Sequence, residues 1–220
     1  MVVSFDQPTI HLTKNNPNTP WHSRLGHPSN QVLKSLGLKT NNYPCNTCAR
    51  GKMTAFPIKG HFVEVLKPLE CLHLHVVGPI SPPSKSGHRS FLTIVNQYTS
   101  FKRTRFLKNK ADVCEEFVSQ KILMENIQDR KIKRILTDGG GEFVNHQFKT
   151  LAAKSSFIHS VSPPYTPEHN SFAERANKTI LDKARCLLLI SNLPSFYWEE
   201  AVNTATHLVN IIPTPSTNNQ

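Results

Sequence analysis

Four side chains near the start of the sequence have the types and the spacing of a zinc site. His22 and His27 are separated by four residues, Cys45 and Cys48 by two, and seventeen residues lie between the two pairs. Imidazole nitrogen and thiolate sulfur are usual ligands of tetrahedral Zn²⁺, and each close pair would fix one edge of the tetrahedron. The alternative is a chance Cys-x-x-Cys beside surface histidines. We expect a structural Zn²⁺, because four protein ligands leave no coordination position open for catalysis.

Two acids later in the chain have the character of ligands for a hard cation. Asp138 follows an apolar run and precedes three glycines, which permit tight turns close to a ligand. Thirty-five residues separate it from Glu174. Lys178 lies one helical turn beyond Glu174, where its ammonium group could reach a phosphate beside a carboxylate-bound metal. Taken alone, these residues could equally belong to an ordinary Asp-Gly turn and a routine Glu–Lys helix pair.

Segments with the periodicity of strands and helices must position these residues. Alternating or wholly apolar runs predict strands at 71–77, 90–96, 101–107, 131–137 and 157–162. Helical spacing predicts helices at 29–38, 111–127, 146–156, 171–191 and 195–212. The apolar stripe of the second of these helices is expected to comprise Val113, Phe117, Ile122 and Leu123. Three successive strands favour a meander, so we expect an α/β domain with a mixed sheet flanked by helices.

Changes in composition divide the chain into five parts. They are an extended lead-in at 1–20, a small helical zinc module at 21–58, a linker at 59–68, the α/β domain at 69–212 and a disordered tail at 213–220. A module of fewer than forty residues has too small a core to be stable alone, so the metal would hold it together.

The overall charge favours an anionic partner such as nucleic acid. Lys and Arg number 26 against 15 Asp and Glu, which gives a formal net charge of +11, and the pI is about 9.6. Within the zinc module, phosphate contacts would suit four residues that are otherwise ordinary solvated charges: Arg24, Lys34, Arg50 and Lys52. We see no membrane span, no signal peptide and no disulfide framework, so we expect an intracellular protein without membrane contact.

Six motifs together resemble the integrases of copia-type long-terminal-repeat retrotransposons, over 193 residues from Trp21 to Pro213. They are "WHSRLGHPS", "CNTCARGK", "GPI", "TDGGGEF", "PYTPEHNSFAER" and "FYWEEAVNTATHLVN". Each motif is weak alone, and the combination is specific. The resemblance implies a GAG-pre-integrase-like zinc module followed by a ribonuclease H-like catalytic core. It also implies a polynucleotidyl transferase that trims element ends and joins their 3′ hydroxyls to target DNA.

The resemblance further implies a set of site residues, cofactors and partners. Two Mg²⁺ or Mn²⁺ ions would be held by two Asp and one Glu, and Asp138 and Glu174 match the second and third acids at the family's spacing. The residues expected to contact nucleic acid are Tyr165, Asn170, Arg175 and Lys178. The partner would be DNA, both element ends and target, and the protein would act as a homo-oligomer in the nucleus, where chromosomal DNA lies.

The first acid of the family pattern is missing from this chain. It belongs on the first predicted strand, two residues after a His and just before "GP", and His75 stands there. The first carboxylate of a two-metal site usually bridges ions about 3.5 to 4 Å apart. Imidazole offers one lone pair, no negative charge and a preference for zinc, copper or iron. His73 shares the strand face but is no carboxylate, and Glu142 has no assignable geometry. We therefore expect this copy to be impaired or inactive.

Other departures point the same way, and two further hypotheses remain. Ser171 stands where these integrases usually have Gly and Glu168 where they often have Gln, which could stiffen a loop or repel DNA. The chain ends after the core, which suggests a fragment of a decayed polyprotein. The second hypothesis is an inactive, zinc-containing nucleic-acid-binding or multimerising relic, which His75 separates from an active integrase. A third, an unrelated zinc-binding regulatory protein, would make all the motifs coincidence.

Overall fold

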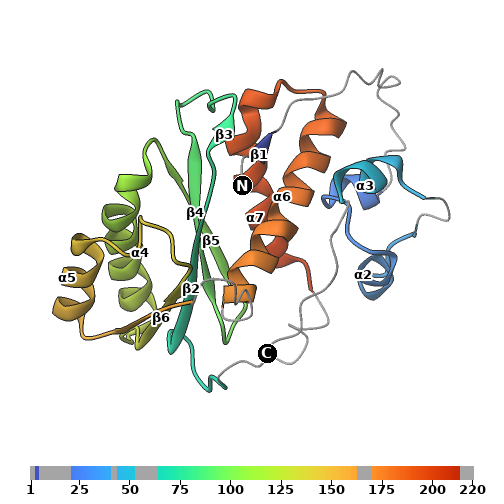
Figure 1. Ribbon diagram of the computed structural model, residues 1–220. Helices are drawn as coiled ribbons and strands as arrows, with labels where there is room; N and C mark the ends of the chain where they lie inside the picture. The colour runs from blue at the N-terminus through green and yellow to red at the C-terminus, as the bar shows by residue number, and fades with distance from the viewer. Residues whose placement is uncertain (1–2, 5–20, 41–43, 53–63, 163–169, 214–220) are drawn as a thin grey trace.

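The computed structural model describes residues 3–4, 21–40, 44–52, 64–162 and 170–213. Within them a five-stranded sheet lies between two pairs of helices, and three short helices lie beyond one of these pairs (Figure 1). This is the mixed sheet flanked by helices that the sequence predicts. No helix of the described part is long and apolar enough to cross a membrane.

The sheet has the strand order β5-β4-β2-β6-β7. β2 pairs antiparallel with β4 and β4 with β5, which is the predicted meander, while β6 runs parallel to both β2 and β7. The bounds are Cys71–Val77 (β2), Ser90–Asn96 (β4), Lys102–Leu107 (β5), Arg134–Thr137 (β6) and Ile158–Val161 (β7). Because β2 and β6 are parallel neighbours, their C-terminal ends reach the same edge of the sheet, where sites commonly form in such folds.

Helices cover both faces of the sheet. α4 and α5 lie on one face, and α6 and α7 lie on the other (Figure 1). The bounds are Lys110–Asp112 (the 3₁₀ turn η1), Val113–Gln128 (α4), His146–Ser155 (α5), Ser171–Ser191 (α6), Ser195–Tyr197 (the 3₁₀ turn η3) and Trp198–Ile211 (α7). Each predicted helix of the α/β domain is therefore present, with its ends shifted by a few residues.

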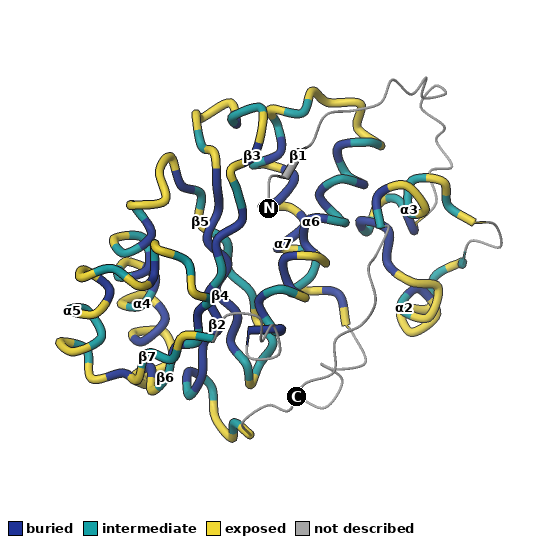
Figure 2. Tube along the Cα trace, in the orientation of Figure 1, coloured by how far each residue is buried: buried dark blue, intermediate teal, exposed yellow. Residues whose placement is uncertain are grey.

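The alternation of side chains along β2 divides them between two environments. Leu72 and Leu74 belong to the apolar core beneath α4 and α5, which Figure 2 shows as buried chain. His73 and His75 face the opposite side, where His73 contacts Asn170, directly before α6, and His75 contacts Asn177, about two turns into α6. A second apolar core around Trp198 fills the space between the sheet and the α6–α7 pair. The predicted sharing of one face by the two histidines is confirmed.

The buried face of α4 differs from the expected one. Phe117 is fully buried, but Ile122 and Leu123 are 53% and 42% exposed. The buried residues of this helix are Val113, Phe117, Gln120, Met124 and Glu125. Gln120 can be buried because its amide oxygen accepts a hydrogen bond of 3.3 Å from the guanidinium of Arg103. The predicted stripe is right for the first half of the helix and wrong for the second.

Three short helices form the module beside α6. They are Trp21–Arg24 (α1), Asn30–Ser35 (α2) and Asn46–Gly51 (α3). α2 begins after Ser29, whose Oγ accepts a hydrogen bond of 3.3 Å from the Val32 N–H, as is usual for a helix N-cap. α1 and α3 are too short to show periodicity, and the sequence did not predict them. Among the module's described residues, Leu33 is the only Leu, Ile, Val, Met, Phe, Tyr or Trp side chain that is buried.

Two residues of the predicted lead-in pair with a short strand of the α/β domain. Val3–Ser4 forms β1, which pairs in parallel with β3 (Ile80–Ser81). The rest of the predicted lead-in, the first part of the predicted linker and the tail after Pro213 lie outside the described residues.

Candidate functional site

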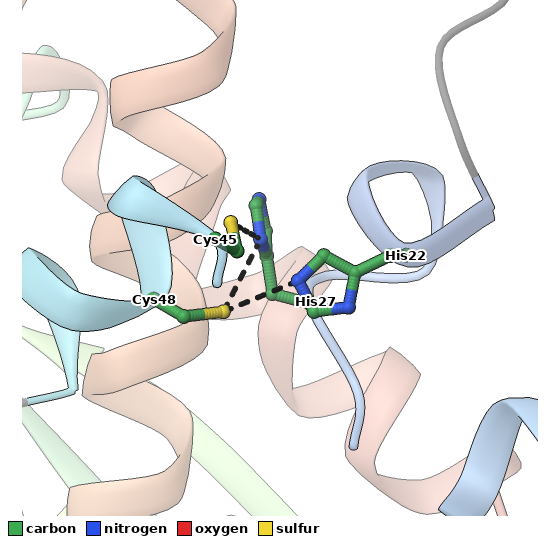
Figure 3. A group of neighbouring side chains, drawn as sticks. All are labelled: His22, His27, Cys45 and Cys48. Carbon is green, nitrogen blue, oxygen red and sulfur yellow. Dashed lines mark hydrogen bonds between the residues drawn. The ribbon is translucent and has the colours of Figure 1, made fainter. Parts of the chain in front are cut away.

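The four predicted zinc ligands lie together between α1 and α3. His22 belongs to α1, His27 to the turn that follows it, and Cys45 and Cys48 to the N-terminal end of α3 (Figure 3). Nε2 of His22 lies 3.2 Å from Sγ of Cys48, and Nδ1 of His27 lies 3.4 and 3.5 Å from Sγ of Cys45 and of Cys48. One ligand atom from each residue lies within 4.8 Å of all the others.

This spacing fits one tetrahedral Zn²⁺. Bonds of about 2.3 Å to sulfur and about 2.0 Å to nitrogen would place neighbouring ligand atoms about 3.5 Å apart. Burial, together with the charges of His22 and Lys52, lowers the pKa of His27 to about 4, so its ring is neutral near pH 7 and can offer a lone pair. Burial raises the pKa of the Cys48 thiol, and zinc would displace its proton on binding. The residues present can therefore hold a structural Zn²⁺.

Two lysines join the zinc loop to its surroundings. Lys52, just after α3, donates a hydrogen bond to the carbonyl of His27, and Lys183 of α6 donates one of 3.2 Å to the carbonyl of Gly26. Burial and the charge of Lys52 lower the pKa of Lys183 to about 8. Gly51 permits close packing, because a Cβ there would lie 2.9 Å from a cysteine sulfur of α6. The module therefore rests directly on α6.

Asp138 and His75 lie at the C-terminal ends of neighbouring parallel strands. His73 of β2 is paired with Leu136 of β6, and continuing this register places His75 beside Asp138. Nε2 of His75 lies 3.3 Å from Oδ2 of Asp138, and both side chains are partly exposed. The position that the family pattern reserves for a carboxylate is thus an imidazole in contact with the second acid.

Further contacts fix this pair in place. Oδ1 of Asp138 accepts a hydrogen bond of 3.2 Å from the Gly140 N–H, so both oxygens of the carboxylate have partners. On the other side of the ring, the side-chain amide nitrogen of Asn177 lies 2.8 Å from Nδ1 of His75. The imidazole of His75 therefore links β2, the end of β6 and α6.

The third predicted acid lies on the same helix as Asn177. Glu174 is half-buried in the first turn of α6, three residues before Asn177, and residues at this spacing share a helix face. Lys178, one turn further, is exposed. Glu142 instead pairs with Lys110 at 3.4 Å. In the part of the chain that the structure describes, the zinc ligands form the only group of three or more His, Cys, Asp or Glu close enough to share a metal ion.

The acid site in this arrangement does not fit a magnesium pair. Mg²⁺ requires oxygen ligands in near-octahedral geometry. His75 supplies a nitrogen in place of an oxygen and already occupies one oxygen of Asp138. Asp138 and the imidazole of His75 are hydrogen-bonded partners rather than ligands of two hard cations, and among the described residues no group close enough to share a metal ion includes Glu174.

The predicted nucleic-acid contacts have different environments. Arg175 is exposed on α6, where its guanidinium lies over the ring of Phe172. Asn170, directly before α6, is only 1% exposed, and its amide nitrogen donates a hydrogen bond of 2.9 Å to the carbonyl of Leu74. Tyr165 lies outside the described residues.

Two residues of these sites were missing from the sequence-based prediction. Asn177 could have been suspected, because it follows Glu174 by three positions on a predicted helix. Lys183 gives no local signal, because its contact with the zinc loop depends on how the module packs on α6. Of the two departures noted near α6, Ser171 is buried at the first turn, and Glu168 lies outside the described residues.

Comparisons of sequence place both parts of the chain among retrotransposon proteins. The family model of the GAG-pre-integrase domain matches residues 4–53. The Pol polyprotein of transposon TNT 1-94 from Nicotiana tabacum is 33% identical over 201 residues, which cover 88% of this chain and 15% of the polyprotein. That of transposon RE2 from Arabidopsis thaliana is 32% identical over 209 residues, 90% of this chain and 14% of the polyprotein. The chain thus corresponds to a small part of either polyprotein.

Solved structures show the same fold. The magnesium complex of the HTLV-2 integrase catalytic core domain, in its trimeric form, has a TM-score of 0.50 at 20% identity, over 70% of this chain and 95% of that one. A simian T-cell lymphotropic virus intasome in complex with the PP2A regulatory subunit B56 gamma has a TM-score of 0.58 at 16% identity, over 88% and 68% of the two chains. The fold is therefore that of an integrase catalytic core, a ribonuclease H-like sheet.

Proposed function

Because this chain belongs to the copia-type retrotransposon integrases, we propose that it is an integrase-type nucleic-acid-binding protein for DNA integration whose catalytic step His75 has disabled. The reaction of the active form would be 3′-end processing followed by strand transfer. The observation that supports the proposed loss of activity is the contact of 3.3 Å between Nε2 of His75 and Oδ2 of Asp138.

The chemistry explains why this one position matters. Two metal ions held by carboxylates clamp the attacking and leaving oxygens of a phosphodiester in line. Asp138 and Glu174 are the carboxylates that this chain retains for that task. His75 adds no negative charge and holds Asp138 by a hydrogen bond instead. Arg175 and Lys178 keep a binding role, because both are exposed on α6 and can contact backbone phosphates.

The proposed partner is DNA, both element ends and target DNA. The net charge of +11 supports it, since neutralising phosphates drives most of the affinity of such proteins. A homo-oligomer is proposed because the structural relatives are described as trimeric and dimeric forms and as an intasome. Nuclear action follows from the need to reach chromosomal DNA.

Strand transfer on a short duplex that mimics an element end tests this proposal. The native chain is compared with His75→Asp, and with His207→Asp as a control that changes an exposed histidine of α7 in the same way. We expect joined product only from His75→Asp, with Mg²⁺ or Mn²⁺. We also expect its Mg²⁺ affinity to rise by more than about tenfold, because even a second-shell partner is worth 10- to 100-fold.

The other outcomes separate the two candidate functions. Joining by the native chain would mean that two acids suffice, and would contradict the disabling role of His75. If neither protein joins DNA but both bind it, the second candidate is favoured, namely an inactive zinc-containing nucleic-acid-binding or multimerising relic. The hydrogen-bonded cluster around His75 is the observation that supports this second candidate.

A further inference from the structure

A cleft of about 200 Å³ lies between the zinc module and the α6–α7 pair. Its lining includes Ser29, Val32 and Lys52 of the module and Thr179, Lys183 and Val209 of the helices. It is smaller than the sites of typical small-molecule ligands, which begin at about 300 Å³, but it has room for several waters of about 30 Å³ each. Most of its lining is apolar and the two lysine ammonium groups supply its charge, so it has room for one small anionic group rather than a larger polar ligand.

Backbone carbonyls of the zinc loop hold both lysines in place. Lys52 reaches the carbonyl of His27 from the module, and Lys183 reaches the adjacent carbonyl of Gly26 from α6. Two ammonium groups are thus brought to neighbouring points from opposite sides of the cleft. An ammonium group has three N–H donors, and each of these hydrogen bonds uses one. The remaining donors can serve a ligand in the cleft.

The positive charge of the two lysines is not balanced by carboxylates. Among the ion pairs of the described residues none involves Lys52 or Lys183, and the acid close to them, Asp182, pairs with Arg185 at 3.4 Å. The ligand thiolates are near, but a bound Zn²⁺ cancels their two negative charges. A zinc-loaded module therefore leaves two cations beside the cleft, an arrangement that an anion would stabilise.

We propose that this cleft is a phosphate site for the backbone of a nucleic acid that lies across the edge where the zinc module meets α6. The inference rests on the proposed DNA binding and extends it to a surface separate from Asp138. Lysine binds phosphate as a point charge, and hydroxyl groups commonly join it. Ser29 can donate its hydroxyl proton, because its Oγ is the acceptor for the Val32 N–H. The net charge of +11 favours a long polyanion over an acidic peptide.

The salt dependence of DNA affinity tests the site. Binding of a short labelled duplex is measured by fluorescence anisotropy over a series of KCl concentrations, with the full zinc-loaded chain. For each phosphate that is no longer neutralised, the slope of log affinity against log salt should fall by about 0.9. We expect this decrease for Lys52→Gln and for Lys183→Gln, and about 1.8 for the double variant. Lys154→Gln, an exposed position on α5 across the sheet, should leave the slope unchanged.

Further variants separate the loss of a positive charge from the loss of folding or of zinc. Lys183→Arg retains the charge and should retain the slope, and zinc content with circular dichroism reports whether each variant is folded. If Lys183→Gln loses zinc, Lys52→Gln alone gives the reading. A double variant that behaves like Lys154→Gln would overturn the phosphate site and leave DNA binding standing. A native chain without DNA affinity would overturn both the phosphate site and the proposed DNA binding. If polyglutamate binding requires both lysines and DNA binding does not depend on them, the partner is an acidic protein instead.

Discussion

At the scale of single residues, Asn170, which the sequence suggested as a nucleic-acid contact, is buried and has side-chain partners within the protein. Its amide nitrogen donates to the carbonyl of Leu74, and its Oδ1 lies 3.2 Å from Nδ1 of His73. Asn170 directly precedes α6 and is buried. It therefore fixes the start of the helix that carries Glu174 against the centre of the sheet.

Removing this amide should destabilise the fold. Asn170→Ala removes the side-chain partner of a buried carbonyl and of a buried ring nitrogen, which we expect to lower the free energy of unfolding by about 1 to 3 kcal/mol. Urea unfolding followed by circular dichroism measures the change. Asn203→Ala, at an exposed position of α7, should change it by less than about 0.5 kcal/mol. Unchanged stability with weakened DNA binding would instead support the nucleic-acid contact that the sequence suggested.

Residues whose partners lie close in the sequence were the ones that could be predicted. The candidate zinc ligands form two pairs that are close in the sequence, and His and Cys at such spacing indicate a metal site. His75 was identified because the motif around it is local. Asn177 meets His75 across 102 positions, and Lys183 meets Gly26 across 157, so neither contact leaves a trace in local spacing. Such residues become visible only when the helices are packed.

At the scale of elements, the apolar residues in the first and second halves of α4 should contribute unequally to stability. Phe117 packs with ring centroids 5.6 Å from Phe148 and 6.2 Å from Phe157, whereas Ile122 faces solvent. We expect Phe117→Ala to cost about 3 to 5 kcal/mol, because it leaves a cavity. Ile122→Ala on the same helix should cost less than about 0.5 kcal/mol. Thermal and urea unfolding measure the loss of stability in the two variants. Equal losses would mean that the buried face of α4 is not the one described.

The predicted elements were correct where a segment had both length and a simple pattern. β4 is buried throughout and was visible as an apolar run, while α6 extends over 21 residues. The stripe of α4 was misassigned in its second half because Gln120, a polar residue, occupies a buried position with Arg103 as its partner. α1 and α3 were not predicted, because helices of 4 and 6 residues complete less than two turns. Both helices instead carry candidate zinc ligands, and α3 packs on α6.

At the scale of the whole molecule, the chain consists of two bodies with different sources of stability. The α/β domain has apolar cores on both faces of its sheet. The zinc module has Leu33 as its single large buried apolar side chain among the described residues, so we expect metal binding and contact with α6 to supply most of its stability. Removal of zinc should therefore unfold the zinc module and leave the α/β domain folded.

The two tryptophans of the chain report these bodies separately. Trp21 lies in α1 with the guanidinium of Arg24 5.5 Å from its ring, and Trp198 is fully buried in the α6–α7 core. On chelation with EDTA we expect the emission of the native chain to change, because α1 loses its structure with the zinc site. Trp21→Phe, in which only Trp198 emits, should show no change. Without EDTA, the emission of Cys48→Ser should resemble that of the chelated native protein. If EDTA also changes the emission of Trp198 in Trp21→Phe, zinc stabilises the core of the α/β domain as well.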